Sequence, residues 1–395
     1  MQSVEKTWYD RVEQGEFAES DELLDEDMAT SEEKLAVASQ WQLMWWRFLK
    51  HRMAVISAVI VLLLYFIAAF SEFVAPYDPE ESFVQYKLAS PSPIHMRDAQ
   101  GNFHAPFVYK IVRTRDPKTL RSIYTEDKSV LYPIRFFVQG SAYKMWGLWP
   151  MRLHLFGVDA PQAEQGVFLW GADRLGRDVF SRTSYGARIS LTIGLVSVVV
   201  SLVLGILLGG LSGFYGGMVD NVIQRVIEFI RSIPEIPLIM GLGAALPADL
   251  PVLQLYFGIT LVLSLIGWTG LARVVRGRFL SLREEDFVMA ARLAGASEMR
   301  VIFRHMLPSF FSHIIASLTL AIPAIILAET GLSFIGLGLR APAISWGVLL
   351  QEAQNVRSMA LAPWVLTPGI AVIITVLAFN FLGDGIRDAA DPYAK

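Results

Sequence analysis

The residue types that support catalysis or metal binding are present, but their spacing suits neither. The six histidines are spread along the chain: His51, His95, His104, His154, His305 and His313. No two of them have a metal-binding spacing on one helix. The chain has no cysteine, and it lacks both the G-x-x-x-x-G-K-[ST] phosphate loop and the G-x-S-x-G turn of a serine nucleophile. We therefore predict a chain that is not an enzyme and binds no metal or cofactor itself.

The stretch DRLGRD (173–178) is the nearest approach to a metal or phosphate site. Its alternating charges directly precede a long apolar segment. At such a position, charged side chains more often cap a helix and form ion pairs at the level of the lipid headgroups. We expect these structural contacts here.

The composition predicts a membrane protein. Of 395 residues, 53% are hydrophobic and 18% are charged, against roughly 25% charged in soluble domains. Five stretches are long enough to cross a bilayer and carry no charge apart from one histidine: Met53–Ser71, Ile189–Val219, Leu250–Ala272, Met306–Ala328 and Ser358–Gly383. A sixth, Val222–Ala245, contains charges and prolines and is predicted to be a polar, broken span. The expected fold class is an all-α polytopic membrane protein with six transmembrane helices.

The positions of lysine and arginine predict the orientation in the membrane. If the amino terminus is cytoplasmic, the short outer loops carry two basic residues, Arg340 and Arg357, whereas the inner side carries twelve. The twelve are Arg47, Lys50, Arg52, Arg273, Arg276, Arg278, Arg283, Arg292, Arg300, Arg304, Arg387 and Lys395. The connection 75–188 is left out because long loops cross the membrane whatever their charge. Both termini are thus predicted to be cytoplasmic.

Residues 1–40 are acidic, with twelve acidic and three basic side chains. A signal peptide would instead begin with a basic region before an apolar core. The composition favours a solvated cytoplasmic tail that is partly disordered.

The segment DFVMAARLAGASEMRVIFRHMLP (286–308) separates two of the predicted spans and contains two short helical patterns. Ser281 and Glu284 fit a capping box at the start of the first helix. One face of that helix carries Phe287, Ala290, Ala291 and Ala294. Gly295 stands where this helix should stop. The pattern predicts a nearly flat strip that another surface can approach closely.

A second helix is expected to follow, with Ser297 as its cap and Pro308 marking its break. Its apolar face would carry Met299, Ile302, Phe303 and Met306. Two interpretations of the whole segment remain open on periodicity alone. It either docks against another protein or lies on the lipid headgroups as basic amphipathic helices do.

These residues resemble the cytoplasmic signature loop of permease subunits in binding-protein-dependent ABC importers, EAA-x3-G-x9-I-x-L-P. Ala290, Ala291, Gly295 and the pair Leu307-Pro308 match it, whereas Met289 and His305 replace the glutamate and the isoleucine. The resemblance implies a coupling loop at 275–309 that fits a groove on an ATPase subunit. The implied coupling residues are Phe287, Met289, Ala290, Ala291, Arg292, Gly295, Ser297, Arg300, Arg304 and Pro308.

Four further stretches resemble the oligopeptide/dipeptide group of this family: 41–79, 170–191, 328–347 and 381–392. Stretch 41–79 is similar to the start of its C-type subunit, in a subgroup with a long external loop. The resemblance implies the type I ABC importer permease fold. It divides the chain into the tail 1–40, an amino-terminal region 41–79 with the first span, an external insertion 80–168 and a core 169–395.

The resemblance also implies a function: ATP-driven import of peptides across a bacterial inner membrane. The implied partners are a homologous second permease, two ATPases that hold ATP and Mg²⁺, a soluble binding protein and membrane lipid, with no nucleic acid. Opines, oligosaccharides or chelated metals are alternative cargoes for the same machinery. A secondary carrier driven by an ion gradient and a scaffold without transport are the rival functions.

Charged and proline residues interrupt RVIEFIRSIPEIPL (225–238). Charges within a span are expected to pair or to face water, and the three-residue spacing of Glu228 and Arg231 permits a pair on one helix face. The candidates for a translocation path are Glu228, Arg231, Ser232, Pro234 and Glu329. In the alternative interpretation the span begins near Ile236, and these charges lie at the cytoplasmic boundary.

Two further features have mainly structural interpretations. Gly205, Gly209, Gly213 and Gly217 are spaced four apart, which lets helix backbones pack closely in lipid. Within 80–168, the turn DAQGN (98–102) precedes β-prone runs at 107–114 and 132–138. We expect a small β or irregular external insertion. It either contacts the binding protein or the outer mouth, or it is a scaffold packed on its own surface.

Overall fold

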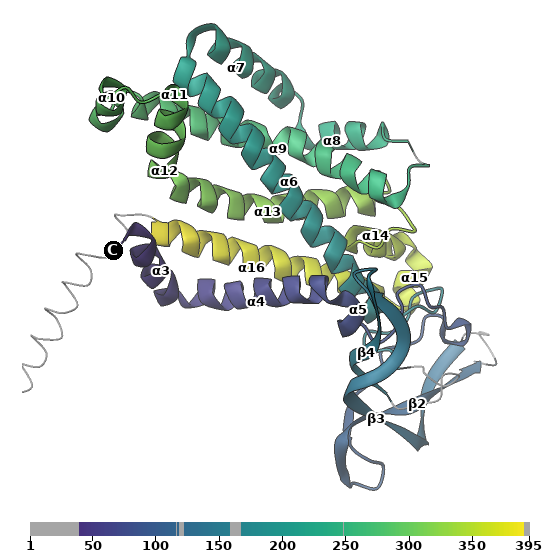
Figure 1. Cartoon of the computed structure of the whole chain (residues 1–395). Helices are drawn as coiled ribbons and strands as arrows, with labels where there is room; N and C mark the ends of the chain where they lie inside the picture. The colour runs from purple at the N-terminus through teal and green to yellow at the C-terminus, as the bar shows by residue number, and fades with distance from the viewer. Residues whose placement is uncertain (1–38, 116, 118–121, 159–166, 248, 391–395) are drawn as a thin grey trace, which may run out of the picture.

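The computed structural model describes residues 39–115, 117, 122–158, 167–247 and 249–390. The predicted acidic tail lies outside these residues, apart from Ser39 and Gln40. Five of the described helices are long and apolar enough to cross a membrane. They are α4 (Arg52–Ala69), α6 (Val179–Tyr215), α9 (Val252–Leu282), α13 (Phe311–Phe334) and α16 (Thr367–Ala390). In Figure 1, α4, α16 and α13 lie side by side and α6 crosses them, which confirms the predicted helical membrane fold.

The third predicted span consists of two shorter helices, α7 (Gly217–Ser232) and α8 (Glu235–Ala244). Ile233 between them is extended, with φ −91° and ψ 131°, as a residue before proline prefers. Neither helix is long enough to cross a bilayer alone. Figure 1 shows that the pair leads from the end of the bundle where α6 finishes to the end where α9 begins. The predicted interruption at Pro234 is therefore confirmed, whereas a continuous sixth helix is not formed.

The short elements gather at the two ends of the bundle (Figure 1). One end holds α3 (Gln40–Lys50) and the end of α16. It also holds the segment between α9 and α13, which comprises α10 (Asp286–Leu293), α11 (Glu298–Arg300), the π-helical turn η3 (Val301–Met306) and α12 (Leu307–Ser309). The other end holds α5 (Ser71–Val74), α14 (Trp346–Gln351), α15 (Val356–Leu361) and a sheet. The described residues also contain three 3-10 turns: η1 (Val84–Tyr86), η4 (Glu352–Gln354) and η5 (Pro363–Leu366).

Helices α6 and α9 pack closely because glycines line their contact. A Cβ on Gly209 would stand 2.4 Å from the carbonyl oxygen of Ala272, and one on Gly213 would stand 2.7 Å from that of Arg276. Gly205 faces the side chain of Leu271 in the same way. The predicted small-residue packing is thus confirmed within this chain for three of the four glycines. Gly217 is different, since it begins α7 at φ +55° with no neighbour in reach.

The insertion forms a four-stranded antiparallel sheet in the order β1–β2–β3–β4. Its strands are β1 (His95–Arg97), β2 (Phe103–Arg115), β3 (Ser122–Met145) and β4 (Trp149–Val158). Both predicted β-prone runs lie in it, the first in β2 and the second in β3. Asp98 closes the predicted turn by accepting hydrogen bonds from the backbone N–H of Gln100 (2.9 Å) and Asn102 (2.8 Å). The expectation of a small β insertion is confirmed.

The charged residues of 173–178 make the structural contacts expected of them. Asp178 caps α6 by accepting a 2.7 Å hydrogen bond from the backbone N–H of Ser181. Asp173 forms an ion pair with Arg177 at 2.7 Å and lies 3.8 Å from Arg182. These contacts fix the start of α6 against the loop that leaves the sheet.

The glycine packing makes a first prediction. Gly209→Val should lower the free energy of unfolding by about 1–3 kcal/mol, because the added side chain overlaps the backbone of α9. Gly277→Val, in α9, is the matched control because no atom lies within 4 Å of its Cβ position. Thermal unfolding of the detergent-solubilised protein measures both. Equal destabilisation of the two variants would contradict close packing of α6 on α9.

Candidate functional site

The segment between α9 and α13, residues 283–310, is the first candidate site, and its start differs from the prediction. Helix α9 runs through Ser281 to Leu282, and α10 begins after Glu285 with no side-chain cap. The predicted capping box of Ser281 and Glu284 is therefore wrong. The buried face of α9 continues to Phe279. Tertiary packing therefore extends α9 past Ser281, where the capping box would have begun a new helix.

The end of α10 follows the prediction. Gly295 has φ +80°, and the backbone N–H of Ala296 donates to the carbonyl of Ala291 at 3.0 Å. This closure requires a left-handed residue, for which glycine has no steric cost. Ser297 then occupies the cap position of α11, although its side chain makes no capping hydrogen bond. The helical path ends at Phe310, two residues after Pro308.

The inner side of this segment is buried against the bundle. Val288 of α10 is fully buried, as are Val301 and Met306 of the π-helical turn. They form one apolar cluster with residues of α6, α9 and α13 and the residue that precedes α13: Phe214, Phe279, Ile314 and Phe310. Burying an aliphatic side chain contributes roughly 1.5–3 kcal/mol. The segment is therefore held to three long helices by several such contacts.

Polar contacts reinforce the same attachment. The guanidinium of Arg292 lies over the ring of Phe214, 5.1 Å from its centroid. The hydroxyl of Tyr215 donates to the carboxylate of Glu298 at 2.8 Å. Both contacts join the segment to the last turn of α6.

The outer side of the segment is apolar and exposed. Leu293 is 89% exposed, and Phe287, Met289, Met299 and Phe303 are also exposed. Three members of the predicted strip point outward (Phe287, Ala290 and Ala294), whereas Ala291 is half-buried against the bundle. The predicted second face is split in the same way, with Ile302 and Met306 buried. Arg292, Arg300, Arg304 and Pro308 are exposed as well.

Two residues of this site were not singled out from the sequence. Val288 is the buried anchor of α10, and its i, i+3 relation to Ala291 is the signal that could have shown it. Leu293 is the most exposed apolar side chain of the segment. A leucine directly before the helix stop is ordinary in a buried helix, so its outward position required the structure.

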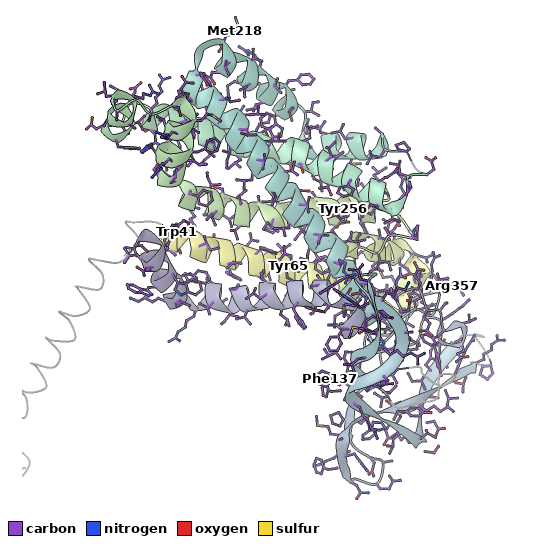
Figure 2. The ribbon with its side chains drawn as sticks, in the orientation of Figure 1. Trp41, Tyr65, Phe137, Met218, Tyr256 and Arg357 are labelled. Carbon is purple, nitrogen blue, oxygen red and sulfur yellow. The ribbon has the colours of Figure 1, made fainter. Side chains whose placement is uncertain are left out.

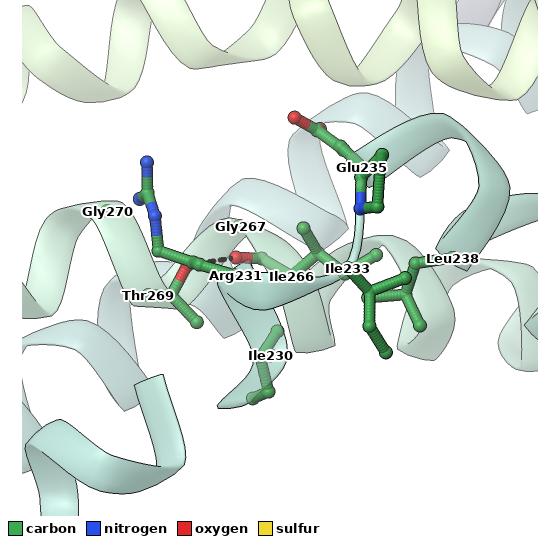
Figure 3. A pocket seen from close by; sticks show the side chains of 10 residues that line it. Ile230, Arg231, Ile233, Glu235, Leu238, Ile266, Gly267, Thr269 and Gly270 are labelled. Carbon is green, nitrogen blue, oxygen red and sulfur yellow. Dashed lines mark hydrogen bonds between the residues drawn. The ribbon is translucent and has the colours of Figure 1, made fainter. Parts of the chain in front are cut away.

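A second candidate site is a cavity of about 340 Å³ beside the α7–α8 connection (Figure 3). Arg231, Pro234 and Glu235 line it with Thr269 and Gly270 of α9. In Figure 3 the side chains of Arg231 and Glu235 point to the same side of the connection. Neither has an ion-pair partner among the described residues. The cavity therefore offers one cation and one anion to whatever enters it.

The ion pair between Glu228 and Arg231 that their spacing permits does not form in the structure. Glu228 pairs instead with Arg225 at 2.8 Å, one turn in the opposite direction along α7. Arg225 and Arg231 each stand three residues from Glu228, so either could pair with it. Because the side chain of Arg231 points toward the cavity, Arg225 is the partner. The Ser232 hydroxyl donates to the carbonyl of Phe229 at 2.7 Å. Of the path candidates, only Arg231 and Pro234 line the cavity.

Glu329 lies apart from this group. It is fully buried in α13 and accepts hydrogen bonds from the hydroxyls of Ser190 (3.2 Å) and Ser333 (2.9 Å). The Ser190 hydroxyl also accepts the backbone N–H of Trp346, at 3.1 Å, so the network joins α6, α13 and α14. A carboxyl group with three helices arranged around it holds the bundle together at this level.

Asp220 and Arg276 join α7 to α9, and the sequence pattern did not point to this pair. Both carboxylate oxygens of Asp220 accept from the Arg276 guanidinium, each at 2.5 Å. The guanidinium holds the pKa of Asp220 below its ordinary value. Arg276 lies near the end of α9, before the segment 283–310, so the pair ties the first turn of α7 to the same end of the bundle.

Comparison with known families identifies the chain. Residues 188–395 match the family model described as "Binding-protein-dependent transport system inner membrane component", and residues 39–91 match the "N-terminal TM domain of oligopeptide transport permease C". The first match alone covers more than half of the chain. The chain belongs to this permease family. As such a permease, it is the membrane-spanning subunit of an ABC importer.

Individual relatives agree with this assignment. The permease is 37% identical to a putative peptide permease protein of Brucella ovis over an alignment of 268 residues. This alignment covers 67% of this chain and 85% of that protein. It is 38% identical to the oligopeptide transport system permease protein OppC of Escherichia coli K12, over 59% of this chain and 74% of that one. Among solved structures, an inward-facing MetNI methionine ABC transporter aligns with 20% identity and a TM-score of 0.42, over 52% of this chain and 94% of that one.

The anchoring of α10 leads to a second prediction. Val288→Ala should speed backbone hydrogen exchange throughout α10, because truncating a buried aliphatic side chain removes about 1–3 kcal/mol of packing. Met289→Ala changes the next residue, which is exposed, and should leave the exchange rates of α10 unchanged apart from its own amide. Hydrogen exchange with mass spectrometry on the purified permease measures both. Identical exchange in the two variants would show that α10 is not held through Val288.

Proposed function

We propose that this permease imports peptides and that the outer side of residues 283–310 is its docking surface for the ATPase subunits. The observation that carries the proposal is the two-sided build of this segment. Its inner side is buried against α6, α9 and α13, and its outer side presents unpartnered apolar side chains at one end of the bundle. An exposed apolar surface on a rigid support is typical of a protein–protein contact.

The same build explains how force would pass from a partner to the bundle. An ATPase that seats on Leu293 and Phe287 holds a segment that cannot shift without moving Phe279 and Phe310. Packed cores respond to such displacement by changing between discrete arrangements. Closure of two ATPases would thereby rock the permease between inward and outward access. This chain needs no catalytic group for that task, because hydrolysis of ATP with Mg²⁺ belongs to the partners.

The cavity beside Arg231 and Glu235 is the proposed part of the translocation path in this chain. A peptide carries an amino group at one end and a carboxylate at the other, so a wall with both charges suits such a cargo. A homologous second permease would close the path on the open side. The names of the relatives, peptide and oligopeptide permeases, support this choice of substrate. Opines, oligosaccharides and chelated metals remain the alternative cargoes.

The predicted orientation completes the assembly. The end that carries residues 283–310, α3 and the end of α16 would face the cytoplasm of a bacterial inner membrane, with both termini inside. The sheet at the opposite end would then face the soluble binding protein. This arrangement follows the distribution of lysine and arginine described above.

A secondary carrier is the rival function, and the two acidic residues that suggested it, Glu228 and Glu329, do not favour it. Glu228 is exposed and paired with Arg225, and Glu329 is bonded to serines away from the cavity. Neither of these two carboxyl groups lines the cavity beside Arg231. Uptake that continues after removal of the ATPase subunits would support the carrier.

Leu293→Asp tests the proposal in the third prediction. Leu293 makes no packing contact that folding needs, so the variant should insert normally but lose ATPase subunits on purification. Peptide uptake should fall about tenfold or more, because an apolar contact worth roughly 1.5–3 kcal/mol is replaced by a charge. Co-purification and uptake of a labelled peptide are the two measurements.

Met218→Asp is the matched control for charge. Met218 is 82% exposed and lies at the start of α7, away from α10 (Figure 2). This variant should retain both the ATPases and uptake. If Leu293→Asp transports peptide like the unaltered permease, the docking surface is misassigned. If ATPases dock normally and another cargo is carried, only the substrate is wrong.

A further inference from the structure

The turn between β3 and β4 is fixed at the level where the first span ends. The indole N–H of Trp146 in this turn donates to the carbonyl of Ala69, the last residue of α4, at 2.6 Å. The ring of Trp146 also lies 5.5 Å from that of Phe70. With 18 residues, α4 is just long enough to cross the hydrocarbon core, so its last residue lies at the headgroup level. The turn must lie at that level too.

Exposed apolar side chains surround this point. Trp146, Leu148 and Trp149 of the turn are exposed, and the two indole rings lie 5.6 Å apart. Phe137 of β3 is exposed and contacts Phe73 of α5 at 6.2 Å between ring centroids. In the view of Figure 2, Phe137 lies on β3 beyond the end of α4. These four residues, Phe137, Trp146, Leu148 and Trp149, form the aromatic patch of the hairpin.

Two members of the patch have a strained backbone conformation. Phe137 has φ +56° and Trp146 has φ +52°, in the left-handed region that bulky side chains rarely adopt. Such residues are strained and persist only where surrounding structure holds them. An aromatic contact supplies that hold at both positions, with Phe73 of α5 for Phe137 and with Phe70, directly after α4, for Trp146.

The patch continues the exposed apolar side of α4. Leu62, Leu63 and Phe66 of this span are exposed, and the ring of Phe66 lies 4.9 Å from that of Phe70, which in turn meets Trp146. A row of apolar side chains thus passes without interruption from the membrane-crossing helix onto the sheet. Tryptophan is enriched at such membrane–water boundaries, where its ring is buried and its N–H finds a partner.

The charge of the hairpin is of one sign. Residues 134–158 contain Arg135, Lys144 and Arg152 and no aspartate or glutamate. Lys144 and Arg152 are exposed on the strands that flank the patch. Aromatic residues beside lysine and arginine, without acids, are typical of segments that lie on a surface of anionic lipid.

We propose that the β3–β4 hairpin is a lipid-binding element whose aromatic patch enters the headgroup region beside α4. Lys144 and Arg152 contact lipid phosphates there. The hairpin thereby holds the sheet on the membrane surface and fixes its height relative to the first span. The proposal needs α4 to cross the membrane but does not depend on the cargo or on the docking of ATPases.

The absence of cysteine from the chain makes a direct test possible. Leu148→Cys places a single spin label in the patch at a side chain that is 69% exposed. Phe103→Cys, at a side chain that is 71% exposed on β2, is the matched control on the same sheet. The assembled transporter is reconstituted in vesicles of phosphatidylcholine alone or with an equal part of phosphatidylglycerol. Collision rates with oxygen and with a water-soluble nickel chelate give the depth of each label.

The label at Leu148 should collide with oxygen freely and with nickel about tenfold less often than the label at Phe103, because the polar chelate is excluded from apolar surroundings. Lys144→Gln with Arg152→Gln should weaken this protection only in vesicles that contain phosphatidylglycerol. Equal nickel collision rates at the two positions would overturn the proposal. Protection from both reagents would overturn it as well, since that result indicates a protein partner on the patch.

Discussion

The attachment of residues 283–310 to the bundle is the contact on which the rest of the structure depends. The two helical pieces of this segment, 286–293 and 298–309, have little stability of their own, since isolated helices shorter than ~12–15 residues are marginal in water. Its position is set by Val288, Val301 and Met306, which are buried among residues of three long helices. Because the inner side is fully used for this attachment, the outer side is free to bind a partner. One short segment would thus serve both as an anchor and as the proposed docking surface.

In the proposed mechanism, the remainder of the bundle would carry motion from that anchor. Glycines on α6 bring its backbone against α9, so the two helices have little freedom to slide independently. The ion pair of Asp220 with Arg276 adds α7, and with it the cavity beside Arg231. The hydrogen bonds of Glu329 join α6, α13 and α14 nearer the opposite end. A displacement at α10 would therefore reach the cavity through packed and bonded elements.

Much of this architecture could be predicted from the sequence, because long uncharged stretches and glycine spacing are strong signals that tertiary packing rarely overrides. The helix stop at Gly295 was equally clear, since its geometry is local. The capping box at Ser281 was wrong because burial of Phe279 extends α9 beyond it. The ion-pair partner of Glu228 could not be predicted, because i, i+3 spacing permits Arg225 as well as Arg231. What the sequence alone leaves open is which of two locally equivalent choices the packing selects.

The most direct test of the account is whether residues 283–310 move with the bundle. Spin labels on Asp286→Cys, at the start of α10 and outside the proposed docking contacts, and on Val274→Cys in α9, both at exposed side chains, report their separation within one permease of the assembled transporter. Pulsed electron resonance would compare this distance in the nucleotide-free state and with a non-hydrolysable ATP analogue. The account predicts an unchanged distance while the ATPases close. A change of several ångströms would contradict it, because the segment would then move independently of the helices to which it is packed.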